Sequence, residues 1–516
     1  MNRRQDSTVF EAYKPLRNAL RKLDLADSLA VLNTYMSHLQ FNQDISRGCE
    51  VHRDYLNASL AQKRSWISEF RLEALCRELI LHAKDSDRPS ESIRHWKFLS
   101  RAMNLLNHLE GLIAERINTP ELLLQEIHRV AHRQLPWQEF RPTSPIITRY
   151  RMIYGHPALA PIVHSSIGLQ PEDLFLHGLS LLGSFIDKFA LRYPPQIHIP
   201  GVSHDGIERF LLHFSKDISN LRSLLKQEQE MNDRFFYAYT SLRAYPIIRM
   251  KYEKRDCLVC PAPTLLFWRF TSGVYYEIYK STGFENAFGK AFQWYAGQVL
   301  EKGTKTDRTR IYPEEEYSVG KFKKQTVDWR LEQNNAVLFI ECKTKRMTHE
   351  AKIQLGHHDS LASELDKMAA MIVQLYKAIK DYREGRYPNH AFDPSRKIYP
   401  MVVTLEDWFL MGPTVFKHLD EEVRKRMDKE RVPLDFLSEM PFTVCSMNEF
   451  EQAVQVMDHA GISTIMGSKI QLETRDWTLS AYLRDKCQQY SGCTQFLFKD
   501  EFNAIGAKAI REWQSE

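Results

Sequence analysis

The sequence predicts a chain of two parts. A large all-α domain over residues 1–245 precedes an α/β domain of the α+β kind over residues 246–516, with a mixed central sheet flanked by helices. Three observations predict this. A length of 516 residues exceeds one ordinary core. Apolar residues recur at helical spacing in the first half, and short β-rich runs alternate with helical patterns after Pro246.

Helical periodicity is clear in the first part. One apolar stripe advances in steps of three and four residues, formed by Leu99, Met103, Leu106, Leu109, Ile113 and Ile117. Thr119, Pro120 and Glu121 then supply a capping hydroxyl, a proline suited to the first helical position and an acid in the first turn. A new helix is expected to begin there.

The pattern changes after Pro246. Two short β-rich runs come first, and two helices are expected before a pair of strands joined by a polar turn. A long helix and another strand follow, and Pro400 in that strand favours an edge position. The expected elements are strands 247–250 and 257–260, helices 264–278 and 284–302, strands 327–331 and 337–343, helix 361–382 and strand 398–405.

Composition is typical of a globular protein and permits a polyanionic partner. Apolar residues make up 43% and aromatic residues 11% of the chain. A formal charge of +5 is mildly basic, which allows nucleic-acid binding without requiring it. Eight scattered cysteines, no secretory signal and no apolar stretch of membrane length predict a cytoplasmic protein without a membrane partner.

The strand 337–343 becomes charged at its end. Side chains alternate between the faces of a strand, so Phe339, Glu341 and Lys343 share one face. Twelve residues separate Asp328 from Glu341, and a tight hairpin can return across that span. The sequence therefore predicts that the carboxylates of Asp328 and Glu341 converge beside Lys343.

These residue types suit metal-assisted hydrolysis of a phosphodiester. Mg²⁺ prefers hard oxygen ligands and needs only one or two carboxylates besides water and phosphate. Asp328 and Glu341 are the candidate metal ligands, and the backbone carbonyl of Cys342 is a third oxygen donor. Lys343 is the candidate catalytic cation, which would orient the attacking water or stabilise the charged transition state.

This arrangement resembles the PD-(D/E)xK, or restriction-endonuclease-like, nuclease superfamily over roughly residues 280–410. The resemblance implies an α-β-β-β-α-β core and Mg²⁺-dependent cleavage of nucleic acid, with DNA as the expected substrate. Mn²⁺ is expected to substitute for Mg²⁺. The positions that match are Asp328, Glu341 and Lys343.

The chain departs from the family pattern at two places. Val327 stands where the motif has proline. Gln293 stands on the preceding helix where members often carry a glutamate, and Glu285 is the nearest alternative acid. A glutamine or tyrosine on the helix after the hairpin lies near the scissile phosphate in some relatives, which makes Gln374 a candidate site residue.

Basic residues around the motif are candidate phosphate contacts. Lys345 and Arg346 directly follow it, and Lys323 and Lys324 precede it. An ordinary solvated face is the alternative for the latter pair. The adjacent His357 and His358 favour a loop rather than a metal site, because no third ligand has zinc spacing.

Three functions remain open from the sequence. The first is a Mg²⁺-dependent endonuclease, with the helical part as a regulatory, recognition or oligomerisation module. The second is a weak or inactive nuclease fold that binds nucleic acid or acts as a scaffold. The third is an oligomeric interaction protein. By analogy of architecture, a bacterial restriction or anti-phage defence system with a partner protein is the expected setting.

Overall fold

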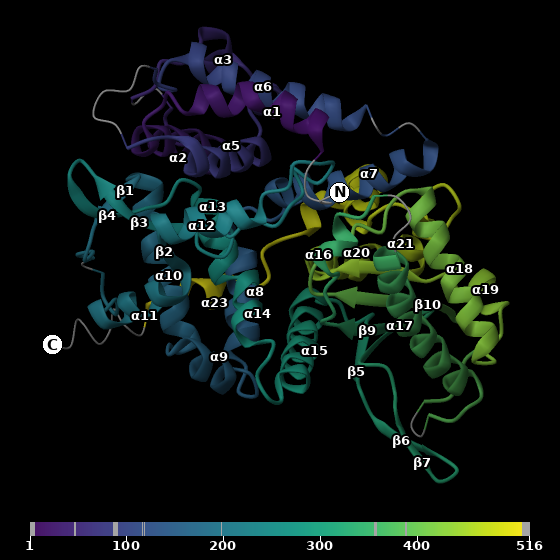
Figure 1. Ribbon diagram of the computed structural model, residues 1–516. Coiled ribbons are helices and arrows are strands. Elements are labelled where there is room, and N and C mark those ends of the chain that lie inside the picture. Colours follow the sequence, from purple (N-terminus) through teal and green to yellow (C-terminus); the bar gives the residue numbers. More distant parts are fainter. Residues whose placement is uncertain are drawn as a thin grey trace. The chain divides into compact units, whose positions relative to one another are not determined.

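The computed structural model describes residues 6–45, 48–85, 91–115, 117, 119–197, 199–355, 359–387 and 390–507. The chain divides into two compact units (Figure 1). The first unit comprises residues 1–123, 130–284 and 500–516, and the second comprises residues 124–129 and 285–499. Residues 246–284, which we expected in the second part, therefore belong to the first unit.

The first unit is mainly helical, and the helices predicted from the apolar stripe and after Thr119 are confirmed. The predicted helix 264–278 is instead divided into three short helices at Thr271 and Tyr275. The stripe from Leu99 to Ile113 is buried along α6, which ends before Ile117. Thr119 caps α7 by accepting a hydrogen bond from the Leu122 N–H at 3.3 Å. The helices before the second unit are α1 (Ser7–Leu20), α2 (Leu25–Phe41), α3 (Arg53–Asn57), α4 (Leu60–Trp66), α5 (Glu69–His82), α6 (Trp96–Ala114), α7 (Pro120–Glu139), α8 (Ser144–Gly155), α9 (Ala160–Ile167), α10 (Pro171–Asp187), α11 (His204–Phe214), α12 (Ile218–Glu228), α13 (Pro263–Phe270), η1 (Ser272–Val274) and α14 (Tyr275–Ile278).

The first 245 residues are not all-α, which corrects the expectation from the sequence. The strands β1 (Ala190–Arg192) and β2 (Ser215–Asp217) join β3 (Ile247–Tyr252) and β4 (Arg255–Val259) in a sheet of order β1-β4-β3-β2. Strands of three residues are too short to show alternation, so periodicity could not reveal β1 and β2.

The second unit contains the mixed sheet that the sequence predicts. Its strand order is β11-β10-β9-β8-β5, where β5, β8 and β9 are antiparallel neighbours and β10 and β11 run parallel to β9. The strands are β5 (Arg310–Pro313), β8 (Trp329–Gln333), β9 (Ala336–Lys343), β10 (Lys397–Thr404) and β11 (Thr443–Ser446).

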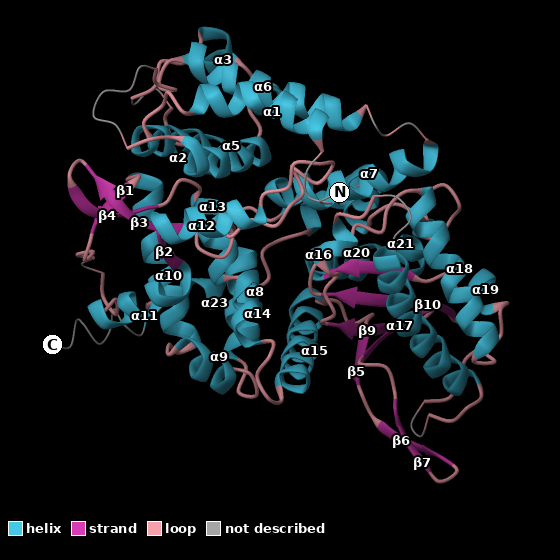
Figure 2. Ribbon diagram, in the orientation of Figure 1, coloured by secondary structure: helices cyan, strands magenta, loops and turns pink. Residues whose placement is uncertain are grey.

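Helices cover both faces of this sheet (Figure 2). The buried face of α17 packs with Phe339 and Val402 in one apolar core. On the opposite face, α15 meets Trp329 through Gly297 and contacts α20 through Gly303. The remaining elements of this unit are α15 (Phe284–Gly303), α16 (His349–Lys352), α17 (Asp359–Arg383), α18 (Pro413–Lys429), α19 (Phe436–Glu439), α20 (Met447–Ala460), α21 (Ile462–Lys469), α22 (Leu479–Lys486) and η2 (Gln488–Cys493). The last helix, α23 (Lys499–Asn503), belongs to the first unit from residue 500 onward.

Two details of the sheet differ from expectation. The turn between β8 and β9 has only Asn334 and Asn335 between the strands, shorter than the predicted four residues. Pro400 lies in an inner strand, not at an edge, because β10 pairs with both β9 and β11. The β11 ladder begins at Met401, one residue beyond Pro400.

A two-stranded hairpin, β6 (Glu316–Val319) with β7 (Phe322–Gln325), leaves the sheet between β5 and β8 (Figure 1). Tyr317 holds its base, because its hydroxyl donates to Asp381 Oδ2 at 2.7 Å. None of the helices in the described residues is long and apolar enough to cross a membrane.

Candidate active site

The hairpin register brings the two predicted carboxylates together. Trp329 pairs with Ile340 at the end of the β8–β9 ladder. One step further out, Asp328 lies across from Glu341, with Asp328 half-buried and Glu341 only 6% exposed. The convergence of Asp328 and Glu341 that the tight hairpin predicted is therefore present, and the register of the ladder is its physical reason.

Asp328 is fixed by the neighbouring strand. Its Oδ2 accepts a hydrogen bond from the backbone N–H of Cys342 at 2.6 Å. The N–H and C=O of one residue in an antiparallel strand point to the same side. The carbonyl of Cys342 therefore points to the same side of β9 as Asp328. A carbonyl on that side can act with Asp328 as an oxygen donor to a metal, as predicted.

Lys343 joins this group from the same face of β9. Its Nζ donates to Glu341 Oε1 at 2.7 Å and to Gln374 Oε1 on α17 at 3.2 Å. Its side chain is 21% exposed, so the amine lies at the edge of the buried carboxylates rather than beneath them. The structure thus brings Gln374 to the candidate site together with the three motif residues.

The two carboxyl groups have elevated pKa values. Burial, and then the charge of Glu341, raises the pKa of Asp328 to about 8 despite the hydrogen bond from Cys342. Burial also raises the pKa of Glu341 despite its contact with Lys343. Two buried carboxyl groups this close resist ionising together unless a cation compensates their charge.

A third carboxylate, which the sequence reasoning missed, acts on this pair. Glu314 directly follows β5, and its charge contributes to the raised pKa of both Asp328 and Glu341. Gln293 Nε2 donates a hydrogen bond to Glu314 Oε2 at 3.1 Å. Gln293 thus contacts an acid that another element supplies.

The signal for Glu314 in the sequence was weak. It begins a run of three glutamates before the β6–β7 hairpin, and such a run ordinarily indicates a solvated segment. Glu285, the alternative acid, is exposed in the first turn of α15. It lies two turns, about 12 Å, along the axis from Gln293.

Four basic residues were predicted to contact phosphate, and their surroundings differ. Lys345 is exposed beyond β9, as a contact with nucleic acid requires. Arg346 is buried and paired with Glu406 at 3.1 Å, so its predicted surface role is not supported. Lys323 pairs with Glu316 across the hairpin at 2.7 Å, and Lys324 pairs with the buried Asp381 at 2.5 Å.

These oxygen donors fit a hard divalent cation that takes only a few of its ligands from the protein. Asp328 and Glu341 supply carboxylate oxygens, and Cys342 supplies a carbonyl on the same side. Within the described residues, no group of three or more His, Cys, Asp or Glu side chains is arranged to hold a metal. Glu314 therefore influences the pair through its charge. His357 and His358 lie outside the described residues.

The chain was compared with known proteins. No protein-family model, no curated protein and no solved structure matches it.

Proposed function

We propose that the second unit is a Mg²⁺-dependent nuclease that hydrolyses phosphodiester bonds, with DNA as its substrate and Mn²⁺ as a substitute metal. The observation that carries this proposal is the placement of Asp328 across from Glu341, with Lys343 on the same face of β9.

Each residue has a distinct role. Bound Mg²⁺ would lower the pKa of a coordinated water and neutralise developing charge on the phosphate. Asp328 and Glu341 would hold that cation, and the hydrogen bond from Cys342 fixes the orientation of Asp328. Lys343, oriented by Gln374, would place its ammonium against the nonbridging oxygens of the scissile phosphate.

The electrostatics favour a cation at this position. Asp328 is half-buried and Glu341 is buried, and burial first, then neighbouring negative charge, raises the pKa of both carboxyl groups. Lys343 forms an ion pair with Glu341 at 2.7 Å, which offsets one of the two negative charges. A divalent cation between the carboxylates would stabilise their ionised forms, and the same charge would attract a phosphate into the site.

The order of elements also supports the proposal. Ignoring the β6–β7 insertion and the short helix α16, the chain runs α15, β5, β8, β9, α17 and β10. This is the α-β-β-β-α-β order that the resemblance to PD-(D/E)xK nucleases implies. The proposal extends to a cytoplasmic enzyme of a bacterial restriction or anti-phage defence system, with the first unit as its regulatory, recognition or oligomerisation module.

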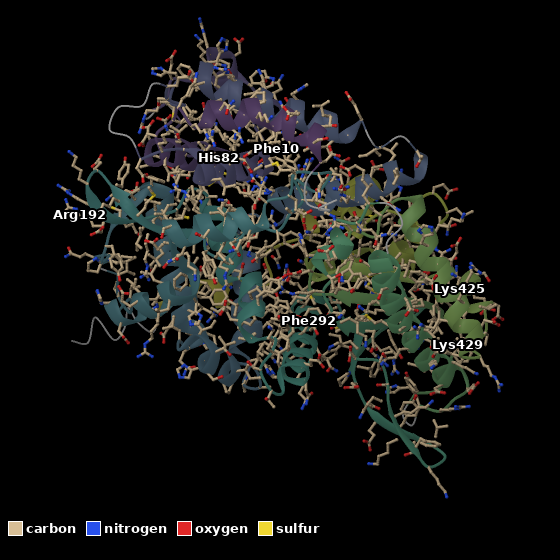
Figure 3. The ribbon with its side chains drawn as sticks, viewed as in Figure 1. Phe10, His82, Arg192, Phe292, Lys425 and Lys429 are labelled. Atoms are coloured by element: carbon tan, nitrogen blue, oxygen red, sulfur yellow. The ribbon has the colours of Figure 1, made fainter. Side chains whose placement is uncertain are left out.

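Cleavage of plasmid, linear duplex and single-stranded DNA, and of RNA, tests this proposal. The full chain is incubated with each substrate in Mg²⁺, Mn²⁺ or EDTA. We expect metal-dependent cleavage of DNA that falls about 100-fold or more in Lys343→Ala, as for loss of other charge-stabilising groups. Lys425→Ala is the matched control, because Lys425 lies 68% exposed on the outer side of α18 (Figure 3). Equal cleavage by wild type and Lys343→Ala would refute the proposal.

A second function is favoured by one observation. Gln293 carries an amide in place of an acid, and the donor set has only two carboxylates. A protein that binds nucleic acid without cutting it would bind DNA equally well in Mg²⁺ and EDTA. Its melting temperature would not change with Mg²⁺.

A further inference from the structure

The first unit contains a cavity of about 330 Å³ between α3, α4 and α6. This volume is at the lower end of the range of roughly 300–1,000 Å³ typical of ligand pockets, so the cavity suits one small ring system. It is lined by His52, Asp54, Ser65, Trp66, Ile67, Trp96, Ser100, Met103, Asn104 and Asn107.

Aromatic rings form part of its wall. Trp66 at the end of α4 and Trp96 at the start of α6 both pack against Tyr55, with ring centroids 6.0 and 5.3 Å apart. Tyr55 is fully buried, whereas Trp66 is 42% exposed. The exposed indole offers a flat face on which a planar ligand can stack.

One face of α6 supplies polar groups. Trp96, Ser100, Asn104 and Asn107 follow at spacings of four, four and three residues, so they share that face. Within the described part of the chain, Asn107 Oδ1 is buried and has no hydrogen-bond partner. Such an acceptor is rare in proteins, and a ligand N–H would satisfy it.

The charge of the lining excludes some ligands. No lysine or arginine is among the described residues that line the cavity. Its acidic group is Asp54, whose Oδ2 lies 3.5 Å from Nδ1 of the neighbouring His52. A phosphate would therefore lack a counter-charge inside, whereas a neutral heterocycle with donor and acceptor atoms matches the carboxamides.

We propose that this cavity binds a nucleobase, adenine in particular, by stacking on Trp66 and by hydrogen bonds to Asn104 and Asn107. A carboxamide matches adenine because it donates to one ring-edge nitrogen and accepts from the exocyclic amine. The base belongs either to a free nucleoside or to an unpaired nucleotide of a strand, since both present the same ring. This site is separate from the candidate active site and does not depend on the proposed nuclease activity.

Calorimetric titration of the full chain with adenosine, in EDTA, tests the proposal. Saturable binding is expected, and it should weaken about 10-fold or more in Trp66→Ala, because base stacking is lost. Asn107→Leu should weaken it as well, while Tyr276→Ala is the control, an aromatic residue 63% exposed and outside the cavity lining. Circular dichroism melts confirm that each variant is folded.

A parallel titration with single-stranded hexadeoxyadenylate distinguishes the sources of the base. Binding of adenosine itself identifies a nucleoside site. Binding of the oligonucleotide alone, lost in the same two variants, identifies an unpaired base. The proposal is overturned if neither probe binds, if both variants bind as wild type does, or if choline binds in place of both probes through the aromatic rings.

Discussion

Gln293 donates a hydrogen bond from Nε2 to Glu314 Oε2 at 3.1 Å, and its backbone carbonyl accepts the indole N–H of Trp329 at 2.9 Å. The glutamine is thus tied to β8 through its main chain and to the end of β5 through its side chain. Gln293 therefore holds the carboxylate of Glu314 in place beside β8.

This relationship predicts the effect of Glu314→Gln. Removing the charge should lower the pKa of Asp328 and weaken the attraction for Mg²⁺. We expect the Mg²⁺ concentration at half-maximal cleavage to rise about 5- to 10-fold, as for loss of an indirect metal-site group. Glu316→Gln, on the hairpin strand β6, is the control. An unchanged Mg²⁺ dependence in Glu314→Gln would show that Glu314 does not act on the site.

The raised pKa of Asp328 predicts a pH-dependent stability. A carboxyl group whose pKa is raised on folding destabilises the folded state as the pH rises from its unfolded value, near 4, toward its folded value of about 8. In EDTA, the melting temperature of Asp328→Asn should therefore exceed that of wild type increasingly between pH 5.5 and pH 8, a window of about 2.5 pH units.

Mg²⁺ should reverse the difference in melting temperature between Asp328→Asn and wild type that is expected in EDTA. Because the metal binds the ionised carboxylates, it should raise the wild-type melting temperature more at pH 8 than at pH 6. Asp485→Asn, an exposed aspartate of α22, should behave as wild type. A difference in melting temperature between wild type and Asp328→Asn that stays constant across this pH range would contradict the raised pKa of Asp328.

Gln374 should act by orienting Lys343. Its Oε1 accepts a hydrogen bond from the Lys343 ammonium at 3.2 Å. Gln374→Ala should lower kcat about 10-fold, the rough equivalent of one hydrogen bond to a charged group, without changing the Mg²⁺ dependence. Gln374→Glu retains an acceptor and should preserve more of the activity than Gln374→Ala. If instead the alanine variant changes only the Mg²⁺ dependence, Gln374 belongs to the metal site.

The packing of α15 on the sheet gives a matched pair of variants. A Cβ at Gly297 would lie 2.2 Å from Trp329 Cζ2, whereas nothing lies within 4 Å of a Cβ at Gly289 on the same helix. Gly297→Ala should lower the free energy of unfolding by about 1–3 kcal/mol through overpacking. Gly289→Ala should raise it by roughly 0.5–1 kcal/mol, because alanine favours a helix interior. Urea denaturation measures the free energy of unfolding of both variants. Equal denaturation midpoints would contradict the close approach of Gly297 to Trp329.

The sequence predicted those parts of the site that depend on neighbouring positions in the chain, and it missed those that depend on contacts between distant segments. Alternation along β9 predicted the shared face of Glu341 and Lys343, and the short hairpin predicted the convergence with Asp328. Glu314 could not be found this way, because its approach depends on β5 pairing with β8 across the intervening hairpin. Burial of Arg346 beside Glu406 likewise depends on contacts distant in the sequence.

The central claim is that Asp328 and Glu341 form the metal site of a nuclease. Single-turnover cleavage of a labelled DNA duplex across a Mg²⁺ titration tests it most directly. We expect cleavage by wild type and by Asp485→Asn, and rates at least about 100-fold lower in both Asp328→Asn and Glu341→Gln. Cleavage at the wild-type rate by either of these two variants would contradict it.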